Sequence, residues 1–100
     1  MSAAKLAAIL NQGAAIHLVD VRAAHELAQG RIAGARHLPL AELPQRLAEL
    51  PADRPVVFYC HSGGRSFQAC RFAAAQGHGE LYNLDGGIVA WLRAGFELTP

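Results

Sequence analysis

A cysteine at the end of an apolar run is the strongest chemical feature of this sequence. Cys60 directly follows VVFY (residues 56–59) and opens the segment CHSGGRS. Where a strand turns sharply into a helix, successive backbone N–H groups point inward and form a concave site for negative charge, which the helix dipole reinforces. A thiol in that site is stabilised as thiolate, the nucleophilic form of cysteine. We therefore predict that Cys60 is a reactive nucleophile rather than a small core residue.

The residues after the cysteine suit a tight anion-binding loop. Two glycines tolerate backbone angles that a side chain would resist. Arg65 supplies a permanent cation, which we expect either to bind an anion or to brace the loop. Ser66 is expected either to cap the following helix or to donate a hydrogen bond to the Cys60 sulfur. The predicted loop consists of His61, Ser62, Gly63, Gly64, Arg65 and Ser66.

Strands that alternate with helices are predicted to position this loop. Apolar periodicity and the glycine and proline punctuation indicate both kinds of element. The predicted strands are 16–22 (IHLVDVR), 35–38 (ARHL), 56–59 (VVFY) and 80–84 (ELYNL). The predicted helices are a first one between Ser2 and Gly13, a short one around 23–28, and others from about Pro44 through Leu50, over 66–76, and from Ile88 to Gly95. In the last helix, Ile88, Trp91 and Leu92 are predicted to share one face.

This alternation predicts an α/β fold with a mainly parallel sheet of four to five strands and helices on both faces. Ligands of such sheets bind at the carboxyl ends of the strands. The segments 20–22, 60–65 and 85–87 each follow a predicted strand, so we expect them to share one edge. Asp20 and Arg22 are expected either to form a structural ion pair or to orient the loop. Gly86 and Gly87 are interpreted as a turn into the last helix.

Composition limits the classes of function. The 100 residues are 52% hydrophobic and carry a net charge of +1, which predicts one domain over 1–100 and argues against nucleic acid or an anionic membrane as a partner. Two cysteines and no long apolar run favour a cytoplasmic protein. Cys70 lies in an Ala-rich helix and is expected to be core. No metal site is predicted, because the spacing of Cys60, Cys70 and His78 matches no zinc pattern.

Four motifs in order resemble the rhodanese family. They are LVDVR at 18–22 with Glu26 beyond it, GRIAGARHLPL at 30–40, CHSGGRS at 60–66 and LDGGIVAW at 84–91, and together they span most of the chain. The sequence is similar to a single-domain thiosulfate sulfurtransferase. Its short N-terminal segment suggests that the family's usual first strand is truncated or missing.

The resemblance implies double displacement through a Cys60 persulfide. Cys60 would take a sulfane sulfur from thiosulfate or a persulfide and pass it to cyanide, a thiol or a protein, with no cofactor. Many members of the family place an arginine directly after the cysteine. With His61 there instead, Arg65 is the one permanent cation of the loop, which weakens the expectation of tight thiosulfate binding and leaves an organic or protein persulfide as donor. A monomer or weak dimer is expected.

Two other functions stay open. A cysteine-dependent phosphatase uses the same thiolate, anion site and arginine, but its pattern has five residues between cysteine and arginine, and only four lie between Cys60 and Arg65. The resemblance also allows a non-catalytic rhodanese-like module that binds proteins, although such modules often lack the cysteine.

Overall fold

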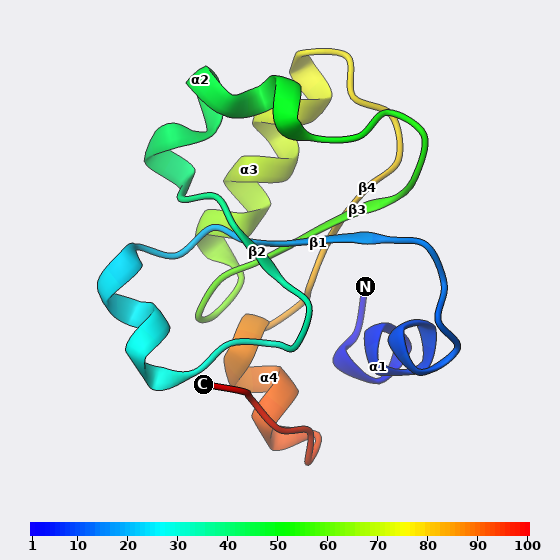
Figure 1. The fold of residues 1–100 in the computed structure, drawn as a ribbon, viewed down its shortest axis with the longest axis vertical. Coiled ribbons are helices and arrows are strands. Elements are labelled where there is room, and N and C mark those ends of the chain that lie inside the picture. The colour runs from blue at the N-terminus through cyan, green and yellow to red at the C-terminus, as the bar shows by residue number, and fades with distance from the viewer.

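A four-stranded parallel sheet forms the centre of the protein (Figure 1). The computed structural model describes all residues from 1 to 100. The order across the sheet is β2-β1-β3-β4, and every neighbouring pair is parallel, which confirms the predicted α/β fold. The strands are β1 (His17–Asp20), β2 (Arg36–His37), β3 (Val56–Tyr59) and β4 (Leu81–Asn83).

Helices cover both faces of this sheet. Figure 1 shows α2 and α3 on one side of the strands and α1 and α4 on the other. Short 3₁₀ helices (η) complete the connections. The helices are α1 (Ala3–Asn11), η1 (Ala24–Gln29), η2 (Leu40–Glu42), α2 (Leu43–Arg46), η3 (Leu47–Glu49), α3 (Gly64–Ala75) and α4 (Gly87–Arg93).

The central strand β3 divides the core into two layers. All four of its residues are buried, as the uninterrupted apolar run predicted. Val56 and Phe58 pack with Ala69 of α3 on one face, whereas Val57 and Tyr59 pack on the opposite face with α1 and α4. Because side chains alternate along a strand, Cys60 continues the Val56 and Phe58 series and faces α3. The loop therefore starts with its sulfur directed beneath the helix that follows it.

Several predicted elements differ from the structure in extent. The helix expected from Pro44 through Leu50 is a short α2 followed by the 3₁₀ turn η3. Leu92 does not share the buried face of α4, since it is 50% exposed while Ile88 and Trp91 are buried. The predicted four to five strands are confirmed at four: the residues before β1 form α1 and no additional strand, as expected if the family's usual first strand is missing. No helix combines the length and apolar character that crossing a membrane requires.

Candidate active site

The sulfur of Cys60 is surrounded by hydrogen-bond donors. The backbone N–H of Gly63 lies 3.1 Å from Sγ, and that of Ser66 lies 3.5 Å away. The Ser66 hydroxyl is 3.3 Å from the same atom. These groups converge because the chain reverses at Gly63, whose φ of +106° is left-handed, and α3 begins immediately afterwards. Two backbone N–H groups, those of Gly63 and Ser66, therefore face the sulfur, as expected for the predicted concave site.

Two opposing effects set the acidity of this thiol. Burial by itself would raise the pKa of Cys60, because a charge is poorly solvated inside a protein. Hydrogen bonds from the Ser66 hydroxyl and from the backbone of Ser66, Gly63 and Ser62 outweigh burial, so the pKa of Cys60 is lowered. The loop thus makes the Cys60 thiol more acidic through hydrogen bonds, with no cationic side chain in contact with the sulfur.

The cysteine lies below the surface. Cys60 is only 1% exposed, whereas His61, Ser62 and Gly64 on the loop above it are exposed. Solvent and ligands therefore meet the rim of the loop first. A reactant can bring a small terminal atom to the sulfur more easily than a bulky group.

Ser66 connects the loop to strand β4. The alternative that Ser66 is the helix N-cap is wrong, because α3 begins at Gly64 and Gly63 is its cap. The Ser66 hydroxyl lies 2.5 Å from Oδ1 of Asn83 and 3.2 Å from the carbonyl oxygen of Gly63, besides its contact with the sulfur. One hydroxyl proton can serve only one of these acceptors at a time. The hydroxyl can therefore turn toward the sulfur when charge develops there.

Asn83 is a site residue that the sequence did not reveal. Its Nδ2 donates to the Gly63 carbonyl at 3.3 Å, while its Oδ1 accepts from Ser66. The one available signal was its place near the end of a predicted strand at the expected ligand edge. Asn83 therefore hydrogen-bonds to both Gly63 and Ser66, the two residues whose N–H groups contact the Cys60 sulfur.

Arg65 braces the loop through an ion pair with Glu26. Its two terminal nitrogens bind the two carboxylate oxygens at 2.6 and 2.9 Å. Ala23 N–H donates to the same carboxylate at 3.1 Å. The Arg65 hydrogen bonds, with that of Ala23, lower the pKa of Glu26 to about 2. Of the two expectations for Arg65, the geometry matches loop bracing, and Glu26 is its scaffold partner.

Asp20 and Arg22 form a buried ion pair under this brace. Both side chains are 1% exposed, and their shortest N–O distance is 2.7 Å. Arg22 also donates to the carbonyl oxygens of Gly30 at 2.8 Å and Glu26 at 3.3 Å. The pair does not hydrogen-bond to the cysteine loop itself. Of the two expectations for Asp20 and Arg22, the structural ion pair therefore describes their direct contacts. Their link to the cysteine loop is indirect and runs through Glu26.

The Gly86–Gly87 turn leads into α4, as we predicted, and it also packs against the cysteine loop, which we did not predict. Ile88 N–H donates to the Cys60 carbonyl at 3.0 Å, and Val89 N–H donates to the His61 carbonyl at 3.1 Å. A Cβ on Gly87 would lie only 2.5 Å from the Cys60 carbonyl oxygen. The first turn of α4 thus fixes the outer side of the loop through its free N–H groups.

Cys70 and His17 lie outside the cysteine site. Cys70 is a free, partly buried thiol packed against the core, and burial raises its pKa to about 11. His17 is partly buried and its pKa is lowered, mainly by that burial. No group of three or more His, Cys, Asp or Glu side chains is arranged to hold a metal ion.

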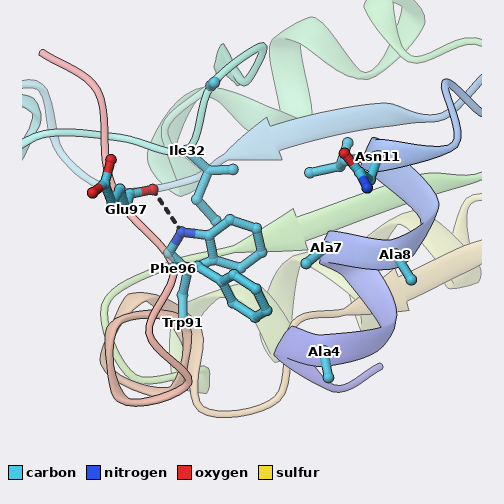
Figure 2. Close-up of a pocket in the computed structure, with 10 residues that line it drawn as sticks. Ala4, Ala7, Ala8, Asn11, Ile32, Trp91, Phe96 and Glu97 are labelled. Carbon is cyan, nitrogen blue, oxygen red and sulfur yellow. Dashed lines mark hydrogen bonds between the residues drawn. The ribbon is translucent and has the colours of Figure 1, made fainter.

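The largest pocket of the protein lies away from the loop. It has a volume of about 720 Å³ and is lined mainly by α1 and the C-terminal segment. Figure 2 shows Trp91 and Phe96 facing Ala7 across it, with the indole N–H donating to the Glu97 carbonyl at 2.8 Å. No loop residue lines it, and Glu97 is its one titratable side chain. This pocket therefore offers no thiol, hydroxyl, imidazole or amine group that could act as a nucleophile.

A buried cysteine that accepts hydrogen bonds from two loop amides, at the carboxyl edge of a parallel sheet, defines an α/β protein with a cysteine loop after its central strand. The family model "Rhodanese-like domain" matches residues 2–94. This protein belongs to the rhodanese family, as the four motifs indicated.

Named relatives and solved structures agree with that membership. The chain is 51% identical over 82 residues to "Sulfurtransferase" of Allochromatium vinosum, covering 82% of this chain and 77% of that protein. It is 40% identical over 84 residues to "Thiosulfate sulfurtransferase GlpE" of Stutzerimonas stutzeri, covering 84% and 75%. A crystal structure of a rhodanese-related protein from Thermoplasma volcanium superposes with a TM-score of 0.89 at 30% identity, covering 98% of this chain and 94% of that one.

Proposed function

We propose that this protein is a sulfurtransferase that carries a sulfane sulfur on Cys60. The observation that carries the proposal is the convergence of the Gly63 and Ser66 N–H groups and the Ser66 hydroxyl on one sulfur atom. A persulfide is an anion at its outer sulfur, so donors arranged for a thiolate also suit the intermediate. Its relatives named sulfurtransferases support the same chemistry.

The reaction takes place in two displacements. The Cys60 thiolate attacks the outer sulfur of thiosulfate or of a persulfide, and the S–S bond of the donor breaks. Sulfite leaves with the bond electrons when the donor is thiosulfate, and a thiolate leaves when it is a persulfide. Cys60 then carries the extra sulfur. In the second step cyanide, a thiol or a protein thiol attacks that outer sulfur, and Cys60 is released as thiolate. The proposal requires no cofactor, and it places the reaction in the cytoplasm.

Intact-mass measurement after treatment with thiosulfate or a persulfide tests this function. The wild-type protein is expected to gain the mass of one sulfur atom, to lose it to dithiothreitol, and to form thiocyanate when cyanide is added. Cys60→Ser should gain nothing, while Cys70→Ser, the matched control, should behave as wild type. A protein that forms no adduct with any sulfane-sulfur donor would refute the proposal.

The same preparations distinguish the two alternative functions. A phosphatase would hydrolyse an aryl phosphate with a Cys60-dependent rate, and a binding module would neither load sulfur nor turn over. The loop argues against the first alternative, because only four residues separate Cys60 from Arg65 and the amides converge on one sulfur. We expect no Cys60-dependent phosphate release.

A further inference from the structure

The side-chain amide of Asn83 is held in one orientation at the end of β4. Its Nδ2 donates to the Gly63 carbonyl at 3.3 Å. The reversed orientation would bring the amide oxygen against that carbonyl oxygen, and neither oxygen has a hydrogen to donate. The amide oxygen Oδ1 therefore faces Ser66, where it accepts from the hydroxyl.

The Ser66 hydroxyl has one proton and three acceptors within reach. Its oxygen lies 2.5 Å from Asn83 Oδ1, 3.2 Å from the Gly63 carbonyl oxygen and 3.3 Å from Cys60 Sγ. The Asn83 contact is the shortest of the three, so the proton belongs to Asn83 while the sulfur is uncharged. In that state the lone pairs of the Ser66 oxygen can accept the weak S–H donor of Cys60.

Ionisation of the cysteine changes the preferred acceptor. A hydrogen bond to a charged group is roughly twice as strong as one between neutral groups. Ser66 is fully buried, so its hydroxyl chooses among these protein acceptors rather than water. The partly exposed Asn83 can be hydrated when the hydroxyl leaves it. The hydroxyl therefore turns from Asn83 to the sulfur when the sulfur is charged, and the lost Asn83 contact opposes that turn.

We propose that Asn83 is a positioning residue that holds the Ser66 hydroxyl while the Cys60 sulfur is uncharged and releases it when charge develops there. The inference rests on the proposed sulfurtransferase function, which supplies both states. Sγ is uncharged in the thiol and in the persulfide, where the outer sulfur carries the charge. When an acceptor attacks that outer sulfur, the S–S bond electrons return to Sγ, and the released hydroxyl stabilises the departing thiolate.

The charged and titratable groups around Cys60 have partners other than Asn83. None of them donates a hydrogen bond to the sulfur, and the rim residue His61 is exposed. They are Arg65 paired with Glu26 of η1, Asp20 of β1 paired with Arg22, Asp85 paired with the amino terminus of Met1, His37 of β2 on the Arg22 carbonyl, and Tyr59 of β3, whose hydroxyl accepts from Ile32. Substitution of Asn83 leaves all of these contacts in place.

Thiolate titration in a double-mutant cycle tests this role. The midpoint of Cys60 ionisation is measured by ultraviolet absorbance in the Cys70→Ala background, with the matching Cys60→Ser protein subtracted. Asn83→Leu removes the acceptor and should lower the midpoint by about 0.7 pH unit, the worth of one ordinary hydrogen bond. With Ser66→Ala also present, Asn83→Leu should leave the midpoint unchanged, because the hydroxyl through which Asn83 acts is gone.

Two features of β4 and the loop make this comparison clean. The Gly63 carbonyl keeps a donor in Asn83→Leu, since Phe67 N–H also donates to it at 3.0 Å. Tyr82→Leu is the matched control, because Tyr82 precedes Asn83 on the same strand and points to the opposite face. It should leave the midpoint unchanged.

Asn83→Asp is a second, independent variant. It loses the Nδ2 donor, as leucine does, but keeps an acceptor that is now charged. Its midpoint should rise, and should rise less when Ser66→Ala removes the hydroxyl, because only charge repulsion then acts. The assignment is overturned by a midpoint that Asn83→Leu raises or leaves unchanged, by one that Asn83→Asp lowers, or by shifts that are equal with and without the Ser66 hydroxyl.

Failure of this inference is distinguishable from failure of the function. The titration uses no sulfur donor, so a refuted role for Asn83 leaves sulfur transfer standing. Absence of a Cys60 persulfide in the intact-mass experiment overturns the function, and with it the part of Asn83 in transfer, whatever the titration gives.

Discussion

Gly87→Ala should destabilise the protein because a methyl group has no room between α4 and the loop. Its Cβ would lie 2.5 Å from the Cys60 carbonyl oxygen and 2.6 Å from that of His61. The left-handed φ of +56° costs about 1 kcal/mol for alanine. Relief of the overlap adds about 2 kcal/mol, as expected for an overpacked site. We therefore expect a loss of about 3 kcal/mol in the free energy of unfolding.

Urea unfolding followed by circular dichroism measures this loss. With an m-value of about 1.5 kcal/mol/M, the midpoint should fall by about 2 M. Gly13→Ala is the matched control, since Gly13 has φ +69° and nothing within 4 Å of its added Cβ. It should cost about 1 kcal/mol, from the backbone alone. If Gly87→Ala costs no more than Gly13→Ala, the close contact between α4 and the loop is refuted.

Three further predictions concern the loop, its brace and the second cysteine. Ser66→Ala should raise the pKa of Cys60 and slow sulfur loading near neutral pH, because one donor to the sulfur is lost; an unchanged pH profile of loading would contradict this. Glu26→Gln should destabilise the protein above pH 4.5, and progressively less as the pH falls toward 2. The reason is that the pKa of Glu26 in the folded protein is lowered to about 2, so its carboxylate stabilises the fold only while it is ionised. A difference in unfolding free energy between the two proteins that does not change with pH would refute the Arg65 pairing. Cys70→Ala should leave loading intact, and Cys70 should resist iodoacetamide at neutral pH because burial raises its pKa to about 11; rapid Cys70 alkylation in the native protein would show this assignment to be wrong.

The sequence predicted those parts of the fold that depend on local pattern. The apolar VVFY run indicated the buried strand β3, and the position of Cys60 after it indicated which loop to examine. Strand alternation then placed Asp20 and Cys60 at one edge of the sheet, where the structure has them.

Long-range contacts were beyond this reasoning. Glu26 and Arg65 are 39 positions apart, and no local pattern links a 3₁₀ turn to the loop. Asn83 contacts Ser66 only because β4 lies beside β3 and α3 packs on both. The start of α3 at Gly64 depends on the left-handed backbone of Gly63. A glycine at position 63 permits that conformation but does not force it. For this reason the sequence also left Ser66 open as the N-cap of the helix.

Direct titration of the Cys60 thiol tests the central claim that main-chain and hydroxyl donors stabilise a sulfur anion. The measurement is the ultraviolet absorbance of thiolate against pH in the Cys70→Ala protein, with the Cys60→Ser, Cys70→Ala protein subtracted and N-acetylcysteine amide titrated alongside. The account predicts a midpoint below that of the free thiol. A midpoint at or above it would mean that burial outweighs the donors, and the account would be contradicted.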